Sequence, residues 1–243
     1  MTKRKLVSLS AGVVLSLAAV RGSPVLDPPC AMSGTYQALI NTDAMGGCTI
    51  AVVGGGSLTF SNFEYTSDGI NPPPASAVGY SLLDGQFTDT TGQPLYGFDF
   101  NPGLPNGSSI QDLALFYTVV ATGITITSAQ LQTNATGGIG RVQEELQFCT
   151  AMDPNPTLGN CGHSFPLIVV GNQPGQMLQQ DAHFGPWTSM TVSKDISCNG
   201  CTDISFVRDG LDVTSTTPEP TTRVLVGIGL LTIAYFSRRR TAR

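Results

Sequence analysis

The middle of this chain is a succession of short apolar segments, each interrupted by glycine, proline, asparagine or aspartate. Short segments rich in β-branched and aromatic residues between turn residues are typical of β-strands. No stretch keeps the apolar period of a long helix. The pattern therefore predicts an all-β domain, an antiparallel β-sandwich of jelly-roll or Ig-like form. We expect about nine strands, within residues 57–66, 77–83, 94–100, 112–120, 124–131, 140–148, 165–170, 187–196 and 203–209.

The first of these segments predicts an irregular strand. Apolar residues alternate on Leu58 and Phe60 and then resume out of phase at Phe63 and Tyr65. Because successive side chains of a strand point to opposite faces, this change of phase predicts a bulge or bend between Phe60 and Phe63.

Charge is distributed unevenly along the chain. Of the 12 basic residues, only Arg141, Lys194 and Arg208 lie between residues 23 and 217. The same stretch holds 16 of the 17 acidic residues, so three positive charges stand against 16 negative ones, a balance of -13. Such a surface repels the phosphate backbone, which excludes nucleic acid as a partner.

The N-terminus has the order of charges and apolar residues of a secretory signal peptide, over residues 1–22. Lys3, Arg4 and Lys5 precede an apolar stretch from Leu6 to Val20. We therefore expect export through the Sec translocon and cleavage by signal peptidase. Cleavage before Ser23 and cleavage after Ala19 both fit the sequence, and an uncleaved signal anchor is the alternative.

The C-terminus, residues 214–243, has three parts in a fixed order. Pro218, Glu219 and Pro220 predict an extended segment, because two prolines disfavour helix and central strand. An apolar stretch, 224–236, predicts a short transmembrane helix of about 20 Å, against a hydrocarbon core of about 30 Å. A basic cluster over 238–243 follows and would stay on the cytoplasmic side by the positive-inside rule; its membrane-stop residues are Arg238, Arg239 and Arg240.

This arrangement resembles the PEP-CTERM sorting signal of Gram-negative bacteria. The resemblance implies processing by an exosortase near Pro218-Glu219-Pro220, with transient anchoring in the inner membrane and release to the cell surface or the medium. Such proteins commonly accompany exopolysaccharide and biofilm systems. The domain between the signals, residues 23–213, is also similar to a loose group of exported bacterial proteins of unknown function. The segments that carry this resemblance are Cys48, Leu58 to Tyr65, Ser109 to Val119, Val192 to Ile196 and Ile204 to Val207.

Six cysteines in a chain bound for an oxidising compartment predict disulfides. Six cysteines allow 15 pairings. We favour pairs of sequence neighbours, which enclose short loops: Cys30 with Cys48, Cys149 with Cys161, and Cys198 with Cys201. The last pair has the C-x-x-C spacing of redox and zinc sites. Because no βαβ unit and no second ligand pair accompanies it, we interpret it as a turn closed by a disulfide.

No catalytic constellation is assembled in the sequence, and we expect the protein not to be an enzyme. His163 and His183 are the only histidines, and no G-x-S-x-G motif supplies an activated serine. Glu144 and Glu145 are adjacent, so on a strand they face opposite sides and cannot form a glycosidase pair. The two histidines remain open as a metal pair, although packing or loop roles are favoured.

Two further groups of residues leave binding functions open. Short acidic clusters could ligate a structural Ca²⁺, although none has the spacing of a calcium loop: Asp153, Asp99 with Asn101, and Asp209 with Asp212. Four aromatic residues could form a sugar-stacking platform, with core packing as the favoured alternative: Tyr80, Tyr96, Tyr117 and Trp187. The leading expectation is a non-catalytic envelope or matrix protein associated with exopolysaccharide. The alternatives are a polysaccharide-active hydrolase and a metal- or carbohydrate-binding module.

Overall fold

The computed structural model describes residues 28–69, 72–102, 111–136, 139–148, 163–171, 177–199 and 203–215. The expected signal peptide, the Pro218-Glu219-Pro220 motif, the segment 224–236 and the arginine cluster lie outside these residues. Within the described ranges, no helix has the length and apolarity needed to cross a membrane.

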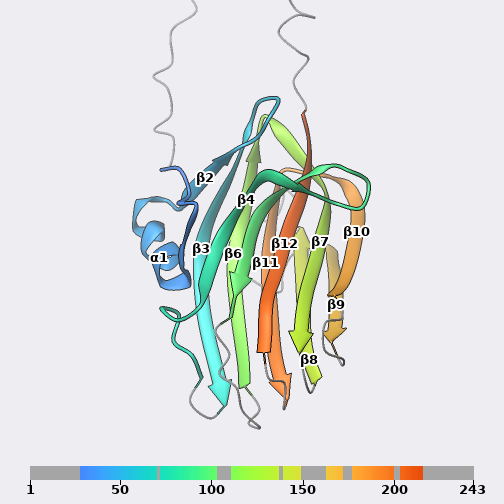
Figure 1. Cartoon of the computed structure of the whole chain (residues 1–243). Coiled ribbons are helices and arrows are strands. Elements are labelled where there is room, and N and C mark those ends of the chain that lie inside the picture. Colours follow the sequence, from blue (N-terminus) through green and yellow to red (C-terminus); the bar gives the residue numbers. More distant parts are fainter. Residues whose placement is uncertain are drawn as a thin grey trace, which may run out of the picture.

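Twelve described strands form two six-stranded sheets that face each other (Figure 1). Sheet A has the order β2-β3-β6-β11-β8-β9, and sheet B the order β1-β4-β5-β12-β7-β10. In sheet A the strands are β2 (Cys48–Ala51), β3 (Ser57–Gly69), β6 (Gln111–Thr122), β11 (Ser189–Asn199), β8 (Ile139–Phe148) and β9 (His163–Gly171). In sheet B they are β1 (Ser33–Thr35), β4 (Gly79–Thr88), β5 (Pro94–Asn101), β12 (Asp203–Ser215), β7 (Ile124–Thr136) and β10 (Met177–Trp187).

Every strand pair in these sheets is antiparallel, so the expected antiparallel β-sandwich is confirmed. The orders β5-β12-β7-β10 and β6-β11-β8-β9 are those of a jelly roll, the first of the two forms expected. The last two strands, β11 and β12, each lie in the interior of their sheet. Each therefore has a strand on both sides and one face toward the other sheet.

The core between the sheets is rich in aromatic side chains. Phe98 of β5 lies at its centre, with ring centroids 4.8 Å from Phe60 and 5.6 Å from Tyr80. Tyr117 of β6 packs against the same ring at 5.9 Å. Edge-to-face contacts of this kind add to the stabilisation from burial. Tyr80, Tyr96 and Tyr117 are all buried, so the core-packing interpretation of these three tyrosines is confirmed.

A short helix, α1 (Tyr36–Thr42), and a 3₁₀ turn, η1 (Asp43–Met45), lie beside β3 (Figure 1). Thr35 caps α1 by accepting a hydrogen bond from the amide of Ala38. Tyr36 is fully buried and donates its hydroxyl to the carbonyl of Phe116. The helix thereby covers one edge of the core. A seven-residue helix is too short to show a sustained apolar period, which is why the sequence pattern gave no sign of it.

The predicted irregularity in β3 is present. The register between β3 and β6 shifts between Ser61 and Glu64, and Asn62 has a positive φ of 57°. The two carboxylate oxygens of Asp43 accept the amides of Asn62 and Phe63 at 2.8 and 2.7 Å. At the bulge these two amides do not take part in the hydrogen bonding between β3 and β6. The Asp43 side chain of η1 supplies their hydrogen-bond acceptors instead.

Candidate functional site

The outer face of sheet B carries a row of polar side chains that crosses all six strands. The register aligns one residue from each strand, in the order Ser33, Ser81, Asp99, Arg208, Gln132 and Gln179. Six strands at about 4.8 Å spacing make a row of about 24 Å. For the four central members, Ser81 to Gln132, the residues before and after each one are buried, so this part of the row follows from the period-2 alternation of the strands.

Hydrogen bonds connect the central members of this row. Arg208 donates to Oδ2 of Asp99 from Nε and Nη2, at 3.2 and 2.8 Å, and to Oε1 of Gln132 from Nη1, at 3.1 Å. Gln132 donates in turn to Gln179 at 3.4 Å. On β10, Gln179 also donates to Asp181, which accepts from Gln130 of β7 as well. The network fixes side chains of four strands in one arrangement before any ligand arrives.

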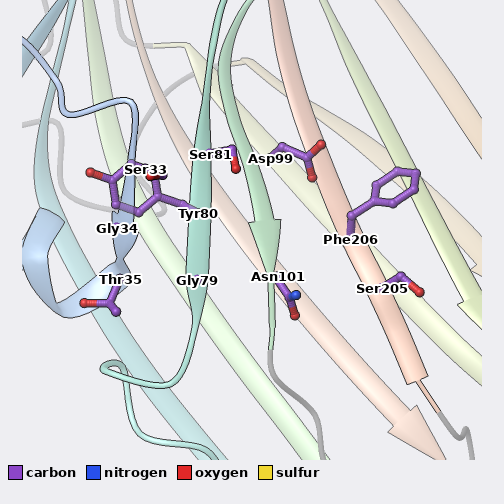
Figure 2. Close-up of a pocket in the computed structure, with 10 residues that line it drawn as sticks. All are labelled: Ser33, Gly34, Thr35, Gly79, Tyr80, Ser81, Asp99, Asn101, Ser205 and Phe206. Carbon is purple, nitrogen blue, oxygen red and sulfur yellow. The ribbon is translucent and has the colours of Figure 1, made fainter.

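A hollow of about 600 Å³ opens on this face beside the row (Figure 2). Its lining comes from strands β1, β4, β5 and β12 and consists mostly of small or polar residues: Ser33, Gly34, Thr35, Gly79, Tyr80, Ser81, Asp99, Asn101, Ser205 and Phe206. Ser33, Ser81 and Asn101 are exposed to solvent. A Cβ at Gly34 would lie 3.0 Å from the ring of Tyr80, so this position in the lining favours glycine. The hollow therefore offers hydroxyl, amide and carboxylate groups to a ligand.

Two phenylalanine rings flank the guanidinium of Arg208. Its Cζ lies 4.3 Å from the ring centroid of Phe87 and 5.2 Å from that of Phe206. Phe87 is 43% exposed, and Phe206 is half-buried at the rim of the hollow. Both rings are thus held by a cation–π contact and still present area to solvent. These rings, and not the predicted tyrosines, supply the aromatic surface; Trp187 is half-buried and packs against the core.

The acidic clusters predicted from sequence fall in different surroundings. Asp99 and Asn101 both line the hollow, but Asp99 is engaged by Arg208. Asp209 faces the core and Asp212 the outer face of sheet B, because the two residues are three positions apart on β12 and successive side chains of a strand alternate between its faces. The expectation that Asp209 and Asp212 could share a Ca²⁺ is therefore wrong. Asp153 lies outside the described residues.

Asp212 lies in a second polar group on the same face. The row of β12, β7 and β10 aligns Asp212 with Ser128 and His183. Ser128 donates its hydroxyl to Oδ2 of Asp212, and both residues are buried. The pKa of Asp212 is raised to about 6, mainly by burial. The hydrogen bond from Ser128 opposes this rise, the charge of Asp89 adds to it, and His183 opposes it. Because Ser128 bonds the carboxylate directly, the histidine does not stand between them as a catalytic triad requires.

The predicted histidines and glutamates are placed as follows. His183 is exposed on β10, the edge strand of sheet B, and His163 begins β9, the edge strand of sheet A. Glu144 is fully buried, whereas Glu145 is half-buried on the opposite face of β8, so the expected alternation is confirmed. Among the residues that the structure describes, no three His, Cys, Asp or Glu side chains are grouped so as to hold a metal ion.

The predicted Cys30–Cys48 disulfide is confirmed and ties the start of the described chain to β2. Cys198, at the end of β11, is also disulfide-bonded. The expected partner Cys201 and the predicted pair Cys149 and Cys161 lie outside the described residues. The pairing of these four cysteines stays a prediction.

Sequence reasoning missed one cluster of charged residues in the core. Lys194 of β11, Glu144 of β8 and Asp209 of β12 are in contact, and all three side chains are fully buried. A signal was present in the sequence, because apolar residues two positions away flank each charge. The three segments read Val142-x-Glu144-x-Leu146, Val192-x-Lys194-x-Ile196 and Val207-x-Asp209-x-Leu211. On strands, this spacing places each charge on the buried face.

Comparison with known proteins gives no family. No protein-family model matches the sequence, and no curated protein matches it either. Among solved structures, that of TmCBM61 in complex with beta-1,4-galactotriose is similar at 8% identity, over 62% of this chain and 88% of that chain, with a TM-score of 0.33. A likeness at that score carries no argument about this protein's fold or function.

Proposed function

We propose that the protein is an exported envelope or matrix protein, sorted by an exosortase, whose sandwich binds polysaccharide without catalysis through the outer face of sheet B. The terminal sequence signals support the export and sorting parts of this proposal. The binding part rests on one observation: the polar row from Ser33 to Gln179 beside an open hollow with an aromatic rim.

The chemistry of this face matches that of a sugar polymer. Sugar hydroxyls are donors and acceptors, and the serine, asparagine and glutamine side chains of the face offer both functions. The apolar side of a sugar ring packs on an aromatic ring such as that of Phe206. A row of about 24 Å is long enough for several sugar units, because it crosses a whole sheet. The ion pair of Arg208 with Asp99 fixes the donors and acceptors in advance, which lowers the entropic cost of binding.

Affinity electrophoresis of the secreted protein through gels containing soluble polysaccharides tests this proposal. We expect retardation by at least one bacterial exopolysaccharide, and a loss of at least tenfold in affinity for Asn101→Ala and for Phe206→Ala. Val120→Ala is the matched control, since Val120 is 41% exposed on the outer face of sheet A. Retardation that is equal in all four proteins would contradict the assignment to sheet B, and no retardation by any polysaccharide would contradict binding.

A polysaccharide hydrolase is the second candidate, and the raised pKa of Asp212 is the observation that favours it, since a general acid needs such a pKa. Two observations weigh against it. Asp212 is only 7% exposed, and Ser128 occupies one of its oxygens, so a glycosidic oxygen has little access to the acid. Release of reducing sugar by the wild type and its loss in Asp212→Asn would favour the hydrolase.

A further inference from the structure

The two sheets meet through three charged side chains in the middle of the core. Nζ of Lys194, from β11 of sheet A, lies 2.9 Å from Oδ2 of Asp209, from β12 of sheet B. Nζ also donates a hydrogen bond to Oε2 of Glu144, which is its direct neighbour in register on β8. None of the three side chains has any exposed surface. An amine and two carboxyl groups are therefore held in contact inside the sandwich.

The surroundings of this cluster are apolar. The residues two positions before and after each charged residue are buried members of the core: Val142, Leu146, Val192, Ile196, Val207 and Leu211. Burying an ion pair in such surroundings costs more than the attraction between the ions returns unless every group is well bonded. Here Oε1 of Glu144 and both oxygens of Asp209 have no hydrogen-bond partner. If all three groups were ionised, the cluster would therefore destabilise the folded protein.

Burial changes which protonation states are populated. It lowers the pKa of Lys194 well below its ordinary value and raises the pKa of Asp209 well above. Two carboxylates and one ammonium would leave a net negative charge in the core, so one additional proton makes the cluster neutral. With that proton on Asp209, its neutral carboxylic acid lies next to the ammonium of Lys194. The carboxylate of Glu144, on the other side of Nζ, is in place to accept a proton from this ammonium.

We propose that Lys194 and Asp209 form an intramolecular isopeptide bond inside the folded domain, with Glu144 as the acid–base group. This modification goes beyond polysaccharide binding and does not depend on it. The reaction condenses an amine with a carboxylic acid, so it requires no oxidant and no other reactant.

The steps balance in atoms and charge. Glu144 takes a proton from the ammonium, and the lone pair of Nζ attacks Cγ of the neutral Asp209 acid. The tetrahedral intermediate loses its hydroxyl as the C–O bond breaks, and a proton passed by Glu144 completes a water molecule. The remaining proton lost by nitrogen stays on Glu144. An ammonium, a carboxylate and an acid thereby become an amide, a neutral Glu144 and one water, so the core loses both of its charges.

The geometry assigns the two carboxyl groups to different roles. Nζ is hydrogen-bonded to Glu144, which suits Glu144 for proton transfer. Asp209 has an oxygen at 2.9 Å from Nζ without being aligned for a hydrogen bond, which leaves its carbon within reach of the nitrogen. Bonding Lys194 to Asp209 would join the interior strands of opposite sheets. Bonding it to Glu144 would only join strands that are already paired.

Intact-mass spectrometry of the secreted, non-reduced protein tests the proposal. We expect a mass lower than that of the chain by one water molecule, after allowing for disulfides. Trypsin should fail to cleave after Lys194, and peptide sequencing should find one branched peptide joining Lys194 to Asp209. A folded wild-type protein that keeps its full mass after prolonged incubation would overturn the proposal. A branch at Glu144 would overturn the assignment to Asp209.

Two variants separate this bond from other sources of the same mass change. Asp209 precedes Gly210, and a succinimide between these residues also releases one water. Lys194→Arg should restore the full mass if the bond is an isopeptide, whereas a succinimide would persist and would be cleaved by hydroxylamine. Glu144→Gln retains both reacting groups and the size of the side chain. We expect it to keep the full mass while circular dichroism shows the β-sheet signature of the wild type. Bond formation in folded Glu144→Gln at the wild-type rate would overturn the role of Glu144.

Discussion

Arg208 of β12 and Asp99 of β5 lie directly opposite each other in register, and two nitrogens of the guanidinium donate to the same aspartate oxygen. Arg208 is one of only three basic residues between residues 23 and 217, and Lys194, another of them, is also in contact with carboxylates. These two cations of an acidic domain therefore join neighbouring or facing strands. The hydrogen bonds of Arg208 to Asp99 and Gln132 also fix the arrangement of polar groups on the outer face of sheet B.

Removing the guanidinium group of Arg208 should destabilise the domain and loosen the polar row. Both partners are about four-fifths buried, at 19% and 18% exposure of their side chains. A hydrogen bond between charged groups contributes about 1.5–3 kcal/mol, so Arg208→Met should lower the free energy of unfolding by about that amount. Urea unfolding measures it. In a double-mutant cycle with Asp99→Asn, the two losses should not add; additive losses would show that the pair is not coupled.

The raised pKa of Asp212 predicts a pH dependence of stability. Its carboxyl titrates at about 6 in the folded protein against an ordinary value of 3.8, so the unfolded chain ionises first as pH rises. This contribution to stability is fully present below 3.8 and is lost as the pH rises through about 6. Asp212→Asn should therefore flatten the decline in unfolding free energy between these values. Parallel pH profiles for the variant and wild type would contradict the shift.

Reduction of the Cys30–Cys48 disulfide should destabilise the N-terminal edge of the sandwich. The bond spans a sequence separation of 18 residues. By the chain-entropy argument, closing such a loop stabilises by about 3 kcal/mol. The double variant Cys30→Ser with Cys48→Ser should show a midpoint of thermal unfolding well below that of the wild type. An unchanged midpoint would mean that the helix α1 and the strand pairing suffice to hold this edge.

Gly97 should tolerate no side chain. Its φ is 147°, and a Cβ at this position would lie 2.3 Å from the carbonyl oxygen of Asp209 on the neighbouring strand. Gly97→Ala should cost about 3 kcal/mol or more, because the β5–β12 ladder has to shift. Gly185→Ala on β10 is the control, since nothing lies within 4 Å of the Cβ there. Equal unfolding free energies for the two variants would contradict the close approach.

The sorting prediction is tested in a host that carries an exosortase. Changing Pro218, Glu219 and Pro220 to alanine should leave unprocessed protein in the membrane fraction, because the extended segment for the processing enzyme is lost. Immunoblots of membrane, surface and medium fractions measure this. Processing and release at the wild-type level would show that these three residues are not the signal.

Most strands were predictable from the sequence, because apolar and polar residues alternate along a strand that has one buried face. The phase change at Phe60 and Phe63 marked the bulge, and the short loop between Cys30 and Cys48 marked the disulfide. Strand β10 was missed, since as an edge strand it is mostly exposed and its sequence, MLQQDAHFGPW, has no clear alternation of apolar residues.

The sites were less accessible to prediction than the strands. Asp209 was named only as a possible Ca²⁺ ligand, and Glu144 was considered and rejected as half of a glycosidase pair. Their contact with Lys194 depends on the register of β8 with β11 and on the two sheets facing each other. Neither relationship is local in sequence. The polar row has the same origin: Ser33 and Gln179 belong to one line of side chains only because six strands from distant parts of the chain adopt one order.

Both limits of the described chain lie at one end of the sandwich (Figure 1). Pro29 bridges to Thr49 and shares a hollow with Gly123, while Ser215 pairs with the adjacent Ile124. A domain held from its C-terminal side at this end would stand upright on its support, with its strands running away from it. The row on sheet B would then lie sideways, parallel to the support. A polymer chain bound along the row would then run parallel to the support and extend from one copy to the next. An array of such copies would bind polymer chains in a layer above the support.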